Sequence, residues 1–270
     1  MKDIQEKQDS IKRKFDLYTT DILKVYNLGK DVRYQISLLD SLDVRLGKHS
    51  ENVANITNKI CNYLNFNQEF IQYVTTCAYI HDIGKLYIPP QIAKKKISEL
   101  TDEEFNEYKK HCEVGFNICR KENTLREFMA GPYYHHEKLD GSGFPQGLKD
   151  KDIPLEAKII AVANMYEHLL NDGGVKESKI KILTEMKEAR KSKAIDKTIF
   201  KALLKSVIDE TEYEIYNLSV YVESLRSEID RFKKALKHYN IARKVNNYNR
   251  QQYHELYSKG YLTSRESIEE

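Results

Sequence analysis

The sequence is poor in helix-breaking residues and lacks a long apolar run. Only 5 of its 270 residues are proline and 11 are glycine, so little interrupts its periodic segments. Its apolar stretches fall short of the ~18 consecutive residues that a membrane-spanning helix needs. Its first residues, MKDIQEKQDSIKRKF, are too polar for a secretory signal. We therefore expect a mostly helical, cytoplasmic protein without a membrane partner.

Cysteine is also scarce, and the 4 cysteines form no CxxC pair. Cys61, Cys77 and Cys119 lie among helical apolar positions, and Cys112 is the fourth. We expect buried free thiols in a reducing compartment, ahead of disulfides or a zinc knuckle. The net charge of +3 is mild. It helps an anionic substrate somewhat and does not indicate a nucleic-acid partner.

Apolar residues recur at helical spacing along most of the chain, which predicts an all-α fold. Helices are expected over residues 4–28, from about Val32, after Gly47, up to His81, from the capping box Thr101–Glu104, and from about Leu155. The segment 131–154 is expected to be mostly loop. Residues 176–208 indicate two further short helices separated near Ser192.

A long helix is predicted towards the C-terminus, where apolar residues keep alternating three- and four-residue steps: Ile215, Leu218, Val222, Leu225, Ile229, Phe232 and Leu236. Such a stripe is the a/d seam of a helix that pairs with another helix. The partner could be the N-terminal helix, the same segment of a second chain in a homodimer, or its own domain. The Lys-, Arg-, Asn- and Tyr-rich stretch that follows indicates a solvated helix face.

Two short strings hold residue types that bind divalent metals and phosphates: HDIGK at 81–85 and HHEKLDGSGFP at 135–145. His49 and His111 lie on the inward faces of their predicted helices. One histidine on an apolar face is usually a hydrogen-bonded core residue. Five histidines converging with Asp82 would be costly to bury without a cation. The pattern indicates a metal-dependent enzyme of phosphate esters.

The strings HDIGKLYIP and HHEKLDGSGFP, the latter followed by IPLEAKIIAVAN, resemble the HD-GYP family, as does His111 with Gly115 four residues on. These HD-domain phosphohydrolases hydrolyse cyclic di-GMP. The resemblance spans roughly residues 49–208. It implies an all-α HD-domain helical bundle over residues 37–208, flanked here by an N-terminal helix (1–36) and a C-terminal helix (209–270). It also implies two divalent metal ions, iron or manganese first, with zinc, cobalt or nickel as alternatives.

The resemblance also implies a role for each matching residue. His49, His81 and Asp82 would hold the first metal, Asp82 would bridge to the second, and His111, His135 and His136 would complete that one. Two cations about 3.5–4 Å apart can lower the pKa of a shared water and neutralise the attacked phosphodiester. A carboxylate suits the bridge because it has two oxygens to share. Lys85 would contact a substrate phosphate, so Asp82 and Lys85 are the expected catalytic residues.

The loop after His136 is expected to lie beside the site. Asp140, Gly141 and Gly143 would form a tight turn there, and Phe144, before Pro145, replaces the family's tyrosine. The aromatic ring is kept and the hydroxyl is lost. Two readings stay open for Glu137 and Asp140: they orient the histidines, or they are simply loop acids.

Three positions depart from the family pattern. Asn164 stands where the family has the last aspartate ligand of the first metal, which should weaken that site. Glu167 or His168, one turn on, could supply the missing ligand, although an exposed pair is the safer expectation. The family's Arg-Pro-Tyr stretch is replaced by NDGGVKESK, which has no arginine, and Arg45 stands where members with a third metal carry glutamate.

Two functions remain in view. The first is a working metal-dependent phosphodiesterase whose substrate is a cyclic dinucleotide, cyclic di-GMP before others. The second is a degenerate family member without turnover that acts as a binding or interaction module. A nucleotide phosphohydrolase of the broader HD group is the weaker third reading, because those enzymes lack the HHExxDGxGxP loop. We favour the enzyme, since all of the expected ligand positions except residue 164 are kept.

Overall fold

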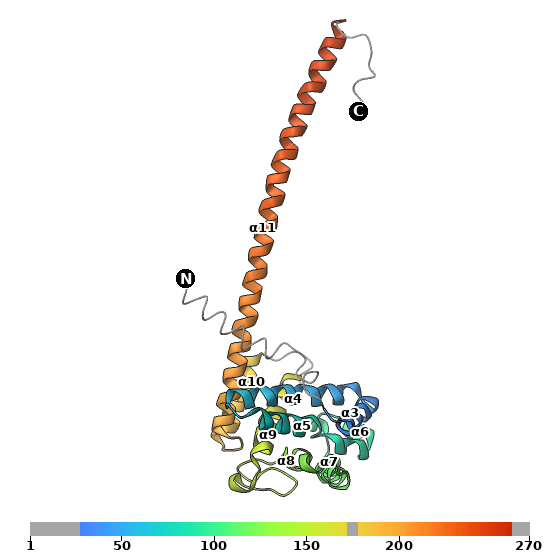
Figure 1. Ribbon diagram of the computed structural model, residues 1–270, viewed down its shortest axis with the longest axis vertical. Coiled ribbons are helices and arrows are strands. Elements are labelled where there is room, and N and C mark those ends of the chain that lie inside the picture. Colours follow the sequence, from blue (N-terminus) through green and yellow to red (C-terminus); the bar gives the residue numbers. More distant parts are fainter. Residues whose placement is uncertain (1–27, 172–177, 261–270) are drawn as a thin grey trace. The chain divides into compact units, whose positions relative to one another are not determined.

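The computed structural model describes residues 28–171 and 178–260, and in these ranges the chain is built from helices (Figure 1). The α-helices are α3 (Lys30–Leu42), α4 (Val44–Tyr63), α5 (Gln68–Tyr79), α6 (Pro90–Ala93), α7 (Asp102–Lys121), α8 (Ala130–Tyr134), α9 (Leu155–Asn171), α10 (Lys179–Lys191) and α11 (Lys197–Ser258). Four short 3₁₀ helices join them: η1 (Ile83–Tyr87), η2 (Ile97–Glu99), η3 (Arg126–Phe128) and η4 (Asp150–Asp152). The predicted all-α class is confirmed. The helix predicted over residues 4–28 lies, but for its last residue, outside the described residues.

Side-chain caps fix where the site-bearing helices begin. The Asp43 carboxylate accepts a hydrogen bond from the Arg45 backbone at the start of α4, and Asn67 does the same for Phe70 in α5. At α7 the Thr101 hydroxyl accepts from the Glu104 backbone, and the Glu104 carboxylate accepts from the Thr101 backbone. The predicted capping box is therefore confirmed. Each cap satisfies a backbone N–H that a helix start leaves open.

The main hydrophobic core lies where α4 packs against α5 and α9 (Figure 1). Apolar residues at helical spacing line the inner faces of these helices, and the first turns of α11 add Ile199, Phe200 and Leu203. All four cysteines are free and buried, as predicted. No helix among the described residues is long and apolar enough to cross a membrane.

The chain divides into two compact units, one ending at Thr211 and the other beginning at Glu212. The first holds helices α3 to α10, the start of α11 and all of the predicted site residues. The described part of the second unit is the rest of α11, followed by a short turn. Its predicted a/d residues are exposed, from Ile215 to Leu236.

Three predicted boundaries were wrong. The helix expected after Gly47 begins earlier, at Val44, because the Asp43 cap starts it there and Gly47 fits inside it under the Asp40 carboxylate. His81 lies beyond the end of α5 rather than at its last turn. The second short helix expected before Ile208 is the start of α11, which continues because no glycine or proline follows that residue before Gly260.

Candidate metal centre

The predicted ligands come from four places in the fold. His49 lies on α4, and His81 and Asp82 occupy the turn between α5 and η1. His111 lies on α7, and His135 and His136 follow α8. The side chains of His49, His81, Asp82, His111 and His135 are all buried. The fold therefore gathers side chains that are up to 86 positions apart in sequence, from His49 to His135.

Two glycines allow these segments to approach closely. A Cβ atom on Gly84 would lie 1.9 Å from the carbonyl oxygen of His111, so only glycine lets η1 meet α7 there. A Cβ atom on Gly115, one turn after His111, would lie 2.8 Å from Pro132 of α8. The glycine of HDIGK and the glycine four residues after His111 thus serve the same purpose. They bring the three histidine-bearing segments together around Asp82.

The Asp82 carboxylate lies between two pairs of imidazoles. Its Oδ2 atom is 3.5 Å from His49 Nε2 and 3.4 Å from His81 Nε2. Its Oδ1 atom is 3.5 Å from His111 Nε2 and 3.7 Å from His135 Nε2. One oxygen faces each pair, which is the arrangement of a carboxylate that bridges two cations.

The four imidazoles turn their Nε2 atoms inward because an acceptor engages each Nδ1 atom. A carbonyl or carboxylate oxygen only accepts, so each Nδ1 carries the proton and each Nε2 offers a lone pair. The Nδ1 acceptors are Glu167 for His49, the Ala78 carbonyl for His81 (2.7 Å), the Tyr108 carbonyl for His111 and the Gly131 carbonyl for His135 (2.9 Å). Such outer partners are typical of metal-binding histidines.

Within each pair the Nε2 atoms face one another. They are 3.2 Å apart in His49 and His81 and 3.1 Å apart in His111 and His135. Two lone pairs at this distance repel, unless a proton or a metal ion lies between them. Burial lowers the pKa of His111 to about 4 and holds that of His135 well below its ordinary value, which disfavours the proton. A metal ion is the group that fits.

Three further buried atoms support this fit. Asp82 Oδ1, His136 Nε2 and Asn164 Oδ1 have no hydrogen-bond partner among the residues that the structure describes. An unsatisfied buried polar atom costs about 1–3 kcal/mol, so these three atoms require an explanation. All three belong to residues that the sequence predicted as metal ligands, including the degenerate position 164.

The electrostatic state of the cluster also suits a cation. Burial raises the pKa of Asp82, but Lys85 and His81 outweigh it and hold that pKa well below its ordinary value. Burial keeps the pKa of His136 well below its usual range. Neutral imidazole and ionised carboxylate are the forms in which these groups bind metals.

The expectation of an exposed Glu167–His168 pair was wrong, because His168 is half-buried and Glu167 is buried. It faces α4 because α9 packs against that helix, and its carboxylate accepts from His49, from Asn52 at 3.0 Å and from Asn171 at 2.7 Å. Burial raises the pKa of Glu167, yet these hydrogen bonds keep it below the ordinary value. Glu167 therefore orients His49, through the nitrogen that faces away from Asp82.

His168 lies against the same histidine, with the two ring centres 4.6 Å apart. Burial lowers the pKa of His168 to about 3, so its ring is neutral and able to bind a metal. The ligand atoms of His49, Glu167 and His168 lie within 4.8 Å of one another. His168 thus lies beside His49, one helical turn after Asn164 on α9.

Lys85 is buried and its Nζ atom lies 2.6 Å from Asp82 Oδ2. Burial lowers the pKa of Lys85, but the attraction of Asp82 outweighs it and raises that pKa above its ordinary value. The ammonium group is therefore charged and stands beside the oxygen that faces His49 and His81.

A cleft of about 340 Å³ opens beside these groups. Its inner wall includes His49, Lys85 and His168. Basic side chains line the rest of the cleft more often than acidic ones: Arg45, Lys48, Lys94, Lys95 and Lys96 against Asp43 and Glu167. Arg45, Lys48 and Lys95 are ion-paired with Asp43, Glu51 and Glu104, so only part of this positive charge is left to attract anionic ligands.

The acids of the HHEKLDGSGFP loop contact the loop itself. Glu137 accepts hydrogen bonds from the backbones of Gln146 (2.7 Å) and Leu148 (2.8 Å), and Asp140 accepts from Ser142. Their hydrogen bonds thus shape the loop that carries Phe144. The Phe144 ring stacks on His136, with the ring centres 4.4 Å apart, so this aromatic ring covers one side of the cluster.

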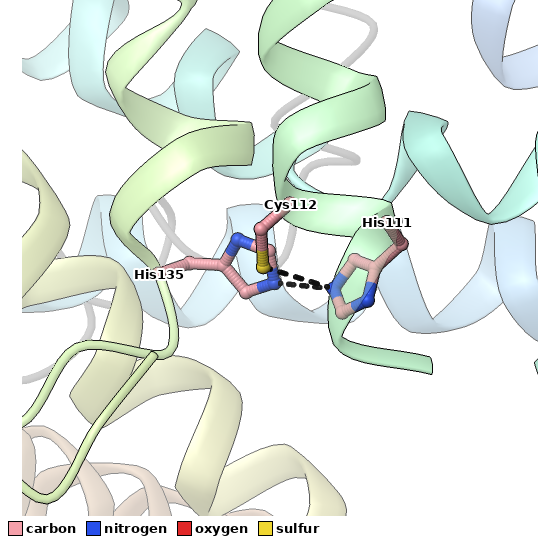
Figure 2. A group of neighbouring side chains, drawn as sticks. All are labelled: His111, Cys112 and His135. Carbon is pink, nitrogen blue, oxygen red and sulfur yellow. Dashed lines mark hydrogen bonds between the residues drawn. The ribbon is translucent and has the colours of Figure 1, made fainter. Parts of the chain in front are cut away.

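Cys112 is the site residue that the sequence prediction did not include. Figure 2 shows its sulfur pointing toward His111 and His135, and the Sγ atom lies 3.5 Å from His111 Nε2. The prediction treated the cysteine as an ordinary buried thiol. The only signal in the sequence was its position directly after His111.

The fold and the buried cluster define an all-helical domain with a histidine–aspartate centre. The chain belongs to the HD domain family, whose model matches residues 33–199. It is similar to a cyclic di-GMP phosphodiesterase from Thermotoga maritima, with 30% identity over 58% of this chain and 40% of that protein. It also resembles the 3'3'-cGAMP-specific phosphodiesterase 2 of Vibrio cholerae, with 28% identity over 60% of this chain and 30% of that protein.

The fold is similar to that of an HDG"Y"P protein from Bdellovibrio bacteriovorus, with a TM-score of 0.51 and 20% identity over 58% of this chain and 50% of that one. The resemblance to HD-GYP proteins drawn from the motifs is thereby confirmed. The chain spans less than half the length of the two curated relatives named above.

We predict that Glu167→Gln weakens metal binding about 10–100-fold, because an amide oxygen holds the His49 N–H less strongly than a carboxylate does. Competition with a chelator measures this directly. Glu156→Gln, on the same helix α9, is the matched control, since Glu156 bonds to Tyr73 rather than to a histidine. Equal metal affinity in both variants would contradict the orienting role of Glu167.

Proposed function

We propose that the protein is a metal-dependent phosphodiesterase that hydrolyses a cyclic dinucleotide, cyclic di-GMP before others. The observation that carries the proposal is the Asp82 carboxylate, with one oxygen toward each of two imidazole pairs. Relatives named for cyclic di-GMP and for 3'3'-cGAMP support the substrate class and leave two candidates within it.

The residues suit this chemistry by holding, orienting and neutralising charge. His49, His81 and Asp82 Oδ2 would hold one cation, and Asp82 Oδ1 with His111 and His135 would hold the other. When bound, two such cations supply an activated water and polarise the phosphodiester. His136 is the further candidate ligand of the second site, and its ring is held in place by Phe144.

Lys85 and the cleft suit an anionic substrate. The Lys85 ammonium, 2.6 Å from Asp82 Oδ2, would be displaced from this oxygen if a cation were held there, and would then be available to a phosphate of the substrate. The segment after α9 lacks the family's arginine. The basic side chains around the cleft would attract the substrate phosphates in its place. The size of the cleft lies within the range usual for small-molecule sites, about 300–1,000 Å³.

The competing function, a degenerate binding module without turnover, draws its support from Asn164. A neutral amide at position 164 supplies no negative charge where the family has a carboxylate ligand, which weakens metal binding. The arrangement around Asp82 argues against a binding module without turnover. One oxygen of this carboxylate faces each imidazole pair, which supports a site for two cations.

We predict that the protein with bound iron or manganese linearises cyclic di-GMP, and that His136→Ala lowers kcat/KM at least about a hundredfold. Chromatography of the products with purified full-length chain measures both. His238→Ala, an exposed histidine on α11, is the matched control and should keep the activity. Metal-loaded protein that leaves both cyclic di-GMP and 3'3'-cGAMP intact would overturn the enzymatic proposal in favour of the binding module.

We further propose that α11 pairs with the same helix of a second copy as a parallel two-stranded coiled coil. The residues at a are Ile215, Val222, Ile229 and Leu236, and those at d are Leu218, Leu225 and Phe232; all are between 38% and 73% exposed. Seven large apolar side chains on one stripe are costly to leave in water. β-Branched residues at most a positions, with leucine at d, favour a parallel dimer.

Charges beside the stripe agree with the parallel orientation. Glu228 occupies a g position and Lys233 the following e position. In a parallel pair these two face each other across the interface and attract. Arg226 and Lys233 both occupy e positions. In an antiparallel pair the e positions of one helix face the e positions of the other, so these basic side chains would face one another and repel. The second copy is therefore a better partner in the parallel arrangement.

We predict that Val222→Glu, at an a position, converts a dimer into a monomer, while Val220→Glu leaves the dimer intact. Both variants place the same charge on the same helix, but Val220 lies at f, away from the stripe. Light scattering coupled to size exclusion gives the mass of each. A dimer that persists in Val222→Glu, or a monomeric unmodified protein, would contradict the proposal and favour pairing within one chain.

The orientation has its own test. In Leu225→Cys the new thiols of two parallel helices lie opposite each other and form a disulfide under oxidation. The native cysteines are buried and do not compete. Failure of Leu225→Cys to cross-link in a chain that is dimeric would refute the parallel arrangement.

A further inference from the structure

Cys112 lies in the half of the cluster that faces Asp82 Oδ1. Its Sγ atom is 3.5 Å from His111 Nε2, and His111 Nε2 is 3.1 Å from His135 Nε2 (Figure 2). The ligand atoms of all three residues lie within 4.8 Å of one another, and all three side chains are buried. A tetrahedral metal with two nitrogen ligands and one sulfur ligand separates these atoms by about 3.3–3.6 Å. The observed distances are close to that geometry.

We propose that Cys112 is a thiolate ligand of the second metal, beside His111 and His135. This inference rests on the proposed metal centre and adds to it a ligand that the family motifs do not contain. When the metal–sulfur bond forms, the S–H bond breaks and its proton passes to solvent. Cys112 thereby adds one negative charge to the ligand set, which has lost a carboxylate at position 164.

The thiolate also defines the class of metal. Sulfur is a soft ligand that favours zinc and iron(II), whereas manganese favours carboxylate, carbonyl and water oxygens. The second site, with imidazole nitrogens and a sulfur around one carboxylate oxygen, is therefore selective for zinc, iron(II) or cobalt(II) over manganese. This narrows the metals expected from the sequence, in which iron and manganese stood together.

The sulfur ligand is tested with cobalt(II) as the probe and full-length protein. Cobalt bound through a thiolate shows sulfur-to-metal charge-transfer absorption in the near ultraviolet, and cobalt bound through nitrogen and oxygen alone does not. We expect this band in the unmodified protein and its loss in Cys112→Ser. Cys119→Ser, a buried cysteine two turns on along α7, is the matched control and should keep the band.

Zinc X-ray absorption on the unmodified protein gives the same answer without a variant: a sulfur neighbour at about 2.3 Å is expected besides nitrogen and oxygen at about 2.0–2.1 Å. Cobalt bound with visible d–d bands but without the charge-transfer band would overturn the role of Cys112 and leave the metal centre standing. Survival of the charge-transfer band in Cys112→Ser would also overturn the role of Cys112 as a ligand. A protein that binds no cobalt would overturn the metal centre itself, and the proposed function with it.

Discussion

The structure of the site depends on one buried interaction, the convergence of four imidazole nitrogens on the two oxygens of Asp82. Every one of these groups is removed from water, so the polar atoms must be satisfied inside the domain. The outer nitrogens find acceptors in backbone carbonyls and in Glu167. The inner nitrogens face one another, the Asp82 carboxylate and, at His111, the Cys112 sulfur. Cations at the centre of the cluster would satisfy these nitrogen and oxygen atoms.

The charge of the ligand set is related to the basic lining of the cleft beside it. Two divalent cations held by neutral imidazoles and few anionic ligands would keep much of their positive charge, since Asn164 stands where the family pattern supplies one more anion. A thiolate at Cys112 would restore part of that balance. The remaining positive charge would attract phosphate, in line with the basic residues of the adjacent cleft. Under the proposed function, metal binding and substrate attraction would both follow from the same ligand set.

The convergence of His49, His81, Asp82, His111 and His135 was predictable, because the strings HDIGK and HHEKLDGSGFP resemble a family whose pattern includes all five positions. The capping box at Thr101 was also predictable, since it depends on two residues three positions apart. The side-chain contacts that Glu167 and Cys112 make between helices far apart in the sequence were not predictable. The burial of Glu167 against His49 depends on how α9 packs on α4, and the placement of Cys112 depends on how α8 meets α7. Neither packing leaves a local pattern in the sequence.

The number of metal ions bound per chain tests the central claim most directly. Native mass spectrometry of the full-length protein, with elemental analysis of the same sample, should find two divalent cations in the unmodified chain. Because one carboxylate faces both imidazole pairs, Asp82→Asn should lose both ions while keeping its helical circular dichroism. An Asp82→Asn protein that still holds two ions, or an unmodified protein that holds none, would contradict the account.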